Sequence, residues 1–394
     1  MDARAFVDTT YGVVTVDHLG SWPHGYYLPA PIPQHLEVDD NTTSAIARAE
    51  KALNFLAGMA TMLPAADVLL AQSLASEALS SSRIEGTQAS LSDVVVASGD
   101  RAVIASQDVR EVINYRDALI EGVRLLQTFP LTQRLFCEVH RVLMTGVRGQ
   151  EKTPGEIRRS PVWVGGSGAT PQGATYIPPL PEKIPELLSD WENFVNTPGV
   201  EGYSVVVRQA LMHYQFETIH PFLDGNGRVG RVLIVLMMIT DGVFQRPLMG
   251  MSNYFERHKS EYYDRLQAVR EKGDMAGWVK FFAGAVHDEA TRQATRLQAL
   301  VTIRESYLNQ ARTLRPAMAK MVDVLLETPV VSVPRVQEAL DVSRPTAVKM
   351  VKEAESHGWL VPLGRTGLGG LRRWYAKDFW DITTDESPGF TVAG

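Results

Sequence analysis

The sequence predicts a mainly α-helical chain with a small β-hairpin, followed by a winged helix-turn-helix segment near its C-terminal end. Apolar residues recur at helical spacing through most of the chain. That periodicity is lost between residues 155 and 181, where Gly, Pro and Ser are frequent. A third pattern, of short helices followed by short β-type runs, begins at about residue 317. No internal repeat is visible, which excludes a repeat architecture.

The expected helices are bounded by capping residues, prolines and glycines. Residues 1 to about 43 are irregular and include a Pro-rich patch, which is typical of an extended segment on a domain surface. Residues 41–44 (NTTS) offer N-caps for a first helix, and Pro64 ends it. Further helices are expected over residues 65–83, 108–126, 131–144, 185–195, 205–219, 256–270 and 278–304, with one more after Gly227.

The non-helical stretch contains two short β-type runs, residues 161–164 (PVWV) and 174–177 (ATYI). Glycines and polar residues separate them. This pattern predicts a β-hairpin or long loop, which forms a flap on an otherwise helical body.

The C-terminal segment is expected to form three helices, over residues 318–326, 334–340 and 345–357. The last two begin with a proline at its tolerated first position, and Gly358 is the expected C-cap of the third. Two β-type runs follow on either side of a Gly-rich tip at residues 364–370. This order is that of a winged helix-turn-helix. Residues 331–376 carry seven basic and four acidic side chains, so DNA and protein both stay open as partners of this segment.

Composition excludes several classes of protein. The 394 residues are 45% hydrophobic and 21% charged, an ordinary globular mixture that excludes disorder over most of the chain. The single cysteine, Cys137, excludes a disulfide framework and fits a reducing compartment. A net charge of −6 excludes a basic nucleic-acid coat. No signal peptide is recognisable, and the most apolar run, residues 232–239, is too short to cross a bilayer, so we expect a cytoplasmic protein.

Residues 220–231, HPFLDGNGRVGR, are the most informative segment. Pro221 ends the preceding helix and places His220 at the C-terminal edge of that helix. Gly225 and Gly227 allow positive φ angles and a close approach of the backbone to a ligand. A Gly-rich turn that opens a helix brings together N–H donors and the positive end of the helix dipole. The segment therefore predicts a phosphate site.

Charged residues of the same segment indicate a polyanion with a metal ion. Arg228 and Arg231 share one face of the first helical turns, where two guanidinium groups repel each other unless an anion lies between them. Asp224 is an oxygen ligand suited to Mg²⁺. His220 is the only group of the segment that exchanges a proton near neutral pH. A β-turn with capping glycines and solvated arginines is the simpler alternative for any one residue, but the ordered set favours the phosphate site.

The segment resembles the signature of the Fic family, H-x-F-x-D/E-G-N-G-R-x-x-R, and matches every specified position. Residues 111–115, 154–158, 213–217, 254–256 and 262–263 also resemble the family's surroundings, so the likeness covers roughly residues 20 to 300. Most Fic proteins transfer AMP from ATP to a Ser, Thr or Tyr hydroxyl of a protein. The resemblance therefore implies a helical Fic-type bundle, ATP as substrate, Mg²⁺ as cofactor, and a target protein, including the chain itself, as partner.

Site roles follow from the resemblance position by position. It implies that His220 is the base that deprotonates the attacking hydroxyl, that Asp224 holds Mg²⁺, and that Asn226 contacts the α-phosphate. It assigns the backbone anion hole to Gly225 and Gly227 and the grip on the outer phosphates to Arg228 and Arg231. The flap at residues 165–177 resembles the family's target-docking hairpin, which aligns an extended segment by β-augmentation.

Residues 81–86, SSRIEG, resemble the family's inhibitory motif, S/T-x-x-x-E-G/N. Ser81 and Glu85 are four residues apart and so face the same side of a helix. The resemblance implies that Glu85 pairs with Arg231 and prevents productive seating of the γ-phosphate. This motif precedes the signature, as in the self-inhibited subclass with an N-terminal inhibitory helix. A helix-end serine and a solvated glutamate are the alternative.

Other clusters are weighed against packing. His213, Glu217 and His220 align on one helix, but the signature already assigns His220 and we do not expect a zinc site. Tyr254, Tyr262 and Tyr263 are either part of an adenine pocket or packing residues. Two further functions stay open besides AMP transfer: a DNA-binding regulator whose Fic domain senses nucleotide, and an enzyme that removes AMP from a modified protein.

The expected domain organisation follows these patterns. It consists of an N-terminal segment with the inhibitory helix (1–110), a Fic catalytic core (111–290), a linker helix (291–316), a winged helix-turn-helix (317–380) and a tail (381–394). A homodimer is also considered, whereas the target protein and the signal that relieves inhibition are not readable from the sequence.

Overall fold

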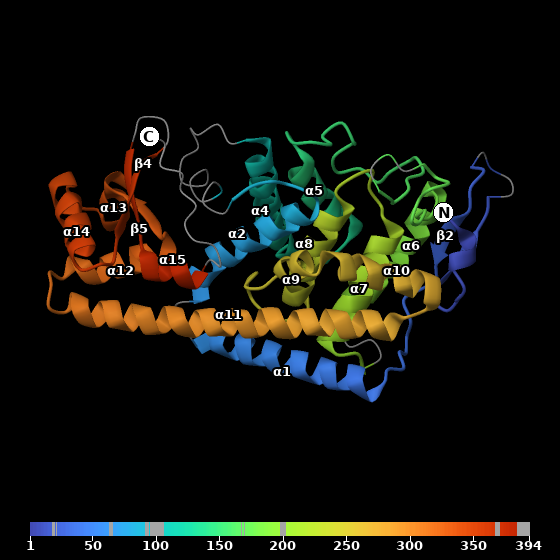
Figure 1. Cartoon of the computed structure of the whole chain (residues 1–394), viewed down its shortest axis with the longest axis horizontal. Helices are drawn as coiled ribbons and strands as arrows, with labels where there is room; N and C mark the ends of the chain where they lie inside the picture. The colour runs from blue at the N-terminus through green and yellow to red at the C-terminus, as the bar shows by residue number, and fades with distance from the viewer. Residues whose placement is uncertain are drawn as a thin grey trace.

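The computed structural model describes residues 1–17, 20, 22–62, 66–90, 94, 106–166, 168, 170–197, 202–366 and 371–383. The chain is mainly helical, as the sequence predicts, and is elongated along its longest helix (Figure 1). The expected tail from residue 384 on, and part of the Gly-rich tip, lie outside the described residues.

The N-terminal segment contains structure that the sequence reading missed. Strands β1 (Gly12–Thr15) and β2 (Tyr26–Pro29) pair antiparallel within the region expected to be irregular. Short 3-10 turns occur at Ala3–Ala5 and Pro181–Lys183. Two long helices follow the strands, α1 (Asp40–Met62) and α2 (Ala66–Ile84), close to the predicted bounds.

The region after α2 is a helical bundle built around two buried helices. The surrounding helices are α4 (Gln107–Leu126), α5 (Gln133–Met144), α6 (Ile184–Asn196), α9 (Ser252–Arg257) and α10 (Lys259–Lys272). In the centre lie α7 (Val205–Ile219) and α8 (Asn226–Thr240), whose residues are buried on nearly every face. A helix that is apolar all round belongs in a core, so the segment between these two helices is held in a rigid frame. The single helix expected at 256–270 is two helices, with His258 between them.

Helix α11 (Met275–Ala311) spans both ends of the molecule, and α1 packs along it (Figure 1). The main hydrophobic core includes residues of α11 up to Ala294, and a second core begins with Leu297. The expected boundary between core and linker, at residues 290 and 291, thus falls inside a continuous helix. The second core covers Leu297 to Phe379 and includes the helices beyond α11.

The C-terminal region has the element order predicted from the sequence. Its elements are α12 (Ala317–Glu327), β3 (Val330–Ser332), α13 (Val333–Leu340), α14 (Arg344–Ser356), β4 (Val361–Thr366), β5 (Leu371–Tyr375) and α15 (Lys377–Thr383). The strands form an antiparallel sheet in the order β3-β5-β4. This arrangement is consistent with a winged helix. Helix α15 crosses the expected boundary at residue 380 and packs on α11, where the hydroxyl of Tyr307 donates to Asp378 at 3.1 Å.

Candidate active site

The segment between α7 and α8 forms a tight turn with two left-handed residues. His220 ends α7 with φ 52° and ψ 61°, and Gly225 precedes α8 with φ 79°. A left-handed His is uncommon, because its Cβ crowds the backbone, so this turn is held in place by its surroundings. Helix α8 begins at Asn226, and the N–H groups of its first turn have no partner within a helix. They form the donor-rich end of the predicted phosphate site.

Buried side chains brace this turn from inside. The amide of Asn226 donates to the carbonyl of Phe222 at 2.9 Å and accepts from the N–H of Phe222 at 2.8 Å. Nε2 of His140 lies 3.0 Å from the carbonyl of Asp224, and Nδ1 accepts from the N–H of Gly155 at 2.8 Å. His140 therefore carries its proton on Nε2 and is neutral, because burial lowers its pKa to about 4. The two bonds to Phe222 use one N–H of the Asn226 amide, so its second side-chain N–H and its backbone N–H remain for the predicted α-phosphate contact.

His220 is arranged as a proton acceptor. Its Nδ1 lies 3.3 Å from the carbonyl oxygen of Glu217, which can only accept a hydrogen bond. The proton of the neutral ring therefore sits on Nδ1, and Nε2 keeps its lone pair. Burial, together with the charge of Arg158, lowers the pKa of His220 to about 3. The imidazole is thus neutral at physiological pH, as a general base requires.

Arg231 is paired with the residues that the inhibitory motif predicts. Its guanidinium donates to the hydroxyl of Ser81 at 2.8 Å, to the carbonyl of Ser81 at 2.9 Å and to Oε1 of Glu85 at 2.8 Å. A Cβ added to Gly227 would lie 2.6 Å from Oε1 of Glu85, so this carboxylate would have to shift if position 227 carried a side chain. Enclosure disfavours charge on Glu85, but the guanidinium of Arg231 outweighs this and lowers the pKa of Glu85.

The other side of the turn holds Asp224 and Arg228. The Asp224 side chain is 46% exposed and lies 3.6 Å from the guanidinium of Arg228, which is 8% exposed. Nε of Arg228 is buried without a hydrogen-bond partner among the described residues. An unpartnered donor beside the first-turn N–H groups is the arrangement expected at an anion-binding site. No cluster of three or more metal-ligating side chains occurs in the described part of the chain. The single carboxylate of Asp224 fits Mg²⁺, which takes few protein ligands and completes its shell with phosphate oxygens and water.

A further buried carboxyl, Glu217, lies behind the turn. The residue is 8% exposed, and its Oε1 has no hydrogen-bond partner among the described residues. Burial raises its pKa to about 7, although the charge of Arg231 opposes that shift. On the same helix, Nε2 of His213 lies 2.8 Å from the hydroxyl of Tyr262, so this ring nitrogen has a hydrogen-bond partner on α10.

The tyrosines proposed for an adenine pocket are separated by the structure. Tyr262 is buried and stacks on Phe255 at 4.5 Å, so it is a packing residue. Tyr263 is 43% exposed, and its charge interactions with Glu85 and Arg231 place it near the nucleotide side of the turn. Tyr254 is half-buried and tilts against His258 at 4.4 Å.

The flap and the C-terminal segment are only partly as expected. The predicted hairpin is reduced to one antiparallel bridge, Val164 to Tyr176, and residues 167 and 169 lie outside the described residues.

In the C-terminal segment Arg344, Lys349 and Lys352 are exposed on α14. Arg373, on β5, is only 7% exposed.

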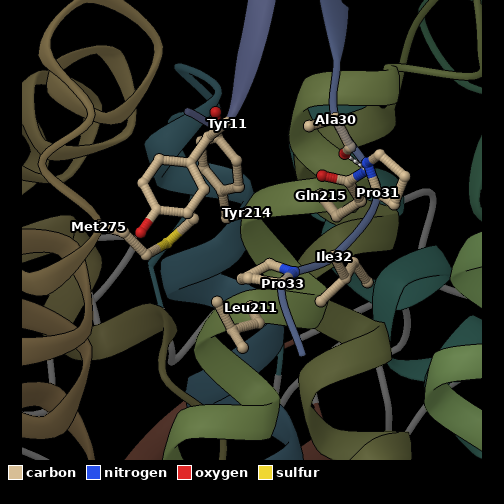
Figure 2. Close-up of a pocket in the computed structure, with 9 residues that line it drawn as sticks. All are labelled: Tyr11, Ala30, Pro31, Ile32, Pro33, Leu211, Tyr214, Gln215 and Met275. Atoms are coloured by element: carbon tan, nitrogen blue, oxygen red, sulfur yellow. Dashed lines mark hydrogen bonds between the residues drawn. The ribbon is translucent and has the colours of Figure 1, made fainter. Parts of the chain in front are cut away.

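A separate pocket lies away from the turn, where the N-terminal segment crosses α7 (Figure 2). Its lining is mostly apolar, and the side-chain amide of Gln215 donates to the carbonyl of Ala30 at 3.0 Å. This contact fastens the segment after β2 to α7. This contact therefore helps to hold the helix that leads to His220, and the pocket is not part of the phosphate site.

Two supporting residues were missed as functional candidates. No functional role was predicted for His140 from the sequence, and Arg158 was included only within the family-like residues 154–158. Both are buried beside the turn, at 0% and 2% exposure. The sequence signal for Arg158 was its place in residues 154–158, PGEIR, although its spatial role depends on contacts across the fold.

Comparisons with known proteins agree with this geometry. Residues 43–124 match a model of the Fic/DOC family N-terminal domain, and residues 130–238 match the model of the Fic/DOC family. The first match includes Ser81 and Glu85, and the second includes the whole signature. The described helices contain no segment long and apolar enough to cross a membrane.

Named relatives and one solved structure extend the comparison. Protein adenylyltransferase Fic of Aedes aegypti is 33% identical over 153 residues, which are 39% of this chain and 27% of that protein. The protein of the same name from Drosophila erecta is 33% identical over 159 residues, 40% of this chain and 28% of that protein. The matches thus span just over a quarter of these relatives. A crystal structure of a Fic family protein from Desulfovibrio desulfuricans G20 has a TM-score of 0.54 at 20% identity, covering 88% of this chain and 98% of that chain, which shows a shared fold. The chain therefore contains a Fic/DOC family N-terminal domain at residues 43–124 and a Fic/DOC family domain at residues 130–238.

Proposed function

We propose that the chain transfers AMP from ATP to a Ser, Thr or Tyr hydroxyl of a target protein, and that Glu85 inhibits this transfer. The observation that carries the proposal is a neutral His220, with Nε2 as acceptor, beside an N–H turn flanked by Arg228 and Arg231. Such a site binds a polyphosphate and removes a proton from a nucleophile. The names of the relatives support the same activity.

The proposed reaction is an in-line displacement at the α-phosphorus. Nε2 of His220 takes the hydroxyl proton, the hydroxyl oxygen bonds to the α-phosphorus, and the bond to the bridging oxygen of the β-phosphate breaks, releasing pyrophosphate. The first-turn N–H groups and Arg228 stabilise the charge that develops on the phosphates. Mg²⁺ held by Asp224 would supply further charge neutralisation.

The inhibitory part of the proposal rests on the Arg231 contacts. A γ-phosphate that approaches Arg231 has to replace Glu85 at a guanidinium that is 1% exposed. Two anions cannot share this group without strong repulsion, because charges interact more strongly where water is excluded. The resting enzyme therefore binds ATP in a form that does not place the α-phosphorus in line with the hydroxyl.

Labelled ATP tests the function. The full chain with Glu85→Gly is incubated with Mg²⁺ and ATP labelled at either the α- or the γ-phosphate. We expect protein labelling from the α-phosphate only. The labelling should be at least roughly tenfold above that of the unsubstituted chain, which corresponds to a free-energy difference of about 1.4 kcal/mol. His220→Ala in the same background is the control, and it should lose transfer while keeping ATP binding. Absence of α-label in every variant would disprove the transfer activity, and loss of label from a pre-modified protein would instead indicate AMP removal.

The exposed cations of α14 favour DNA binding as a second function of the C-terminal segment. Arg344, Lys349 and Lys352 reach solvent at the helix that a winged helix places in a major groove. Retardation of duplex DNA in a gel, reduced by Arg344→Ala and Lys349→Ala, would support this function. Unchanged mobility at low salt would contradict it.

A further inference from the structure

Arg158 holds the turn that carries His220 through main-chain carbonyls. The side chain donates to the carbonyl of His220 at 2.8 Å through Nε and to that of Pro179 at 2.6 Å through an η nitrogen. It also reaches the carbonyl of Ser160 at 3.2 Å and that of Ile219 at 3.4 Å. Its backbone N–H donates to Pro221 at 2.9 Å. One residue therefore contacts three consecutive positions of the turn.

The way in which this charge is buried indicates a specific role. Arg158 is 2% exposed and forms no ion pair within 4.0 Å among the described residues, and the carboxylate of Glu182 influences its charge only from a greater distance. A buried cation without a counterion is costly, and only the planar fork of arginine can satisfy several carbonyls at once. Burial lowers the pKa of Arg158 to about 10, so it remains charged at neutral pH. If this position served folding alone, an apolar side chain would give a more favourable free energy of folding than a buried cation.

The same guanidinium joins the base to the flap. Ser160 and Pro179 flank the flap on its two sides, and His220 lies at the end of α7. The left-handed conformation of His220 needs outside support, which the bonds to its carbonyl and to that of Ile219 provide. The charged groups that influence the imidazole are Arg158, Arg270 of α10 and Glu85, which directly follows α2. Of these, Arg158 has the largest effect, after burial.

We propose that Arg158 is a positioning residue for His220: it fixes the left-handed turn, places its positive charge near the imidazole and ties that turn to both ends of the flap. This rests on the proposed role of His220 as the base. A hydroxyl aligned along the flap would then meet Nε2 in a fixed register. No bond is made or broken at Arg158 itself.

Two substitutions separate charge from geometry, and a third is the control. Arg158→Gln removes the charge, whereas Arg158→Lys keeps it but cannot span the carbonyls. Arg208→Lys is the control. Like Arg158, Arg208 is buried and donates to main-chain carbonyls, here those of Thr197 and Val195. It lies on α7, at the opposite end of that helix from His220. All are made in the full chain carrying Glu85→Gly.

The first readout does not depend on activity. The ring carbons of ¹³C-labelled histidine are titrated by NMR, and the His220 signal is identified by its loss in His220→Ala. We expect the pKa of His220 to rise by at least about one unit in Arg158→Gln, and to stay within about half a unit in Arg158→Lys and Arg208→Lys. An unchanged His220 titration in Arg158→Gln would overturn the proposal.

The second readout is AMP transfer. Arg158→Lys should lower kcat by roughly tenfold to a hundredfold with little change in KM for ATP, because a displaced base loses its reactive geometry. Arg208→Lys should lower the melting temperature as much as Arg158→Lys does, but its kcat should stay within about twofold of that of the Glu85→Gly chain. Equal kcat in Arg158→Lys and Arg208→Lys would overturn the positioning role. If no Glu85→Gly variant transfers AMP, the proposed function fails, while the NMR titration still decides what Arg158 does to His220.

Discussion

The two sides of the signature turn differ in how far the protein already satisfies their charges. On the closed side, Arg231 has its donors engaged by Ser81 and Glu85 and is 1% exposed. On the open side, Arg228 has a buried Nε without a partner among the described residues, and the carboxylate of Asp224 is 46% exposed. The cation of the closed side is already paired within the protein, whereas the cation of the open side keeps an unpartnered donor among the described residues.

This difference shows where a nucleotide would bind freely and where it would compete. Phosphates that meet the open side replace water and satisfy an orphaned donor, which is favourable. A phosphate that meets the closed side must first displace a carboxylate from a water-excluded guanidinium. Affinity and productive geometry therefore depend on different residues, and substitutions should separate them.

The largest effect is expected when the closed side loses its cation. Arg231→Ala in the Glu85→Gly chain should lower AMP transfer by roughly a hundredfold, about 2.7 kcal/mol, since a preorganised charge on the phosphates is lost. Transfer is measured with α-labelled ATP and ATP affinity by calorimetry. Transfer retained within threefold would show that Arg231 does not hold a phosphate.

The next effect concerns Glu217, the buried carboxyl of the closed side, and is measured as the free energy of unfolding. Burial raises the pKa of Glu217 from 4.5 to about 7, so the unfolded chain releases this proton at lower pH than the folded chain does. The stability contributed by the protonated carboxyl is full below pH 4.5 and is lost as pH rises to about 7. Between pH 5 and 7 the loss is at most about 2 kcal/mol.

Urea unfolding at several pH values measures this loss in the unsubstituted chain and in Glu217→Gln. The difference between the two should move in favour of the variant as pH rises from 5 to 7. Glu289 has a pKa raised to about 7 by burial as well. Glu289→Gln is the control, and only Glu217→Gln should also change ATP affinity across this pH range. Parallel curves for Glu217→Gln and the unsubstituted chain would contradict the assignment.

On the open side, Asp224→Asn should lower transfer roughly tenfold in the Glu85→Gly chain, because a neutral amide is a poorer ligand for Mg²⁺ than a carboxylate. Raising the Mg²⁺ concentration should restore part of the rate. Chelation of Mg²⁺ by EDTA should abolish transfer in both chains. A rate that ignores both the substitution and the Mg²⁺ concentration would exclude a metal at this position.

The smallest effect is expected at Ser81. Ser81→Ala removes one hydroxyl acceptor from Arg231 but leaves Glu85 in place, so it weakens the closed side by about 1 kcal/mol. Transfer by the otherwise unsubstituted chain should rise roughly fivefold. A rise as large as that of Glu85→Gly would instead make Ser81 the main inhibitory contact.

Local patterns predicted most helices and the order of the C-terminal elements, because periodicity and capping are local properties. They failed where pairing partners are distant. Strands β1 and β2 were read as irregular, since each is only four residues long and gains its structure from the other. The helix expected at 256–270 was in fact divided at His258, where packing rather than propensity decides the break.

Within the site, the sequence identified the residues but not all of their partners. The spacing of Ser81 and Glu85 and the signature itself were readable, and the structure places the predicted pair in contact at 2.8 Å. It could not show that the side chain of Asn226 turns back to Phe222, or that His140 braces Asp224. These contacts join residues from different helices or across a folded turn.

By itself the sequence determined the resemblance to Fic/DOC domains, the helical class and the set of groups at residues 220–231, since each depends on residue type and spacing along the chain. The tertiary structure decided which of those groups are free. It buried Arg231 against α2, left Asp224 open, and put the guanidinium of Arg158 under the carbonyl of His220. Burial and partnership are properties of the packed chain, and they set the charge and availability of every group in the site.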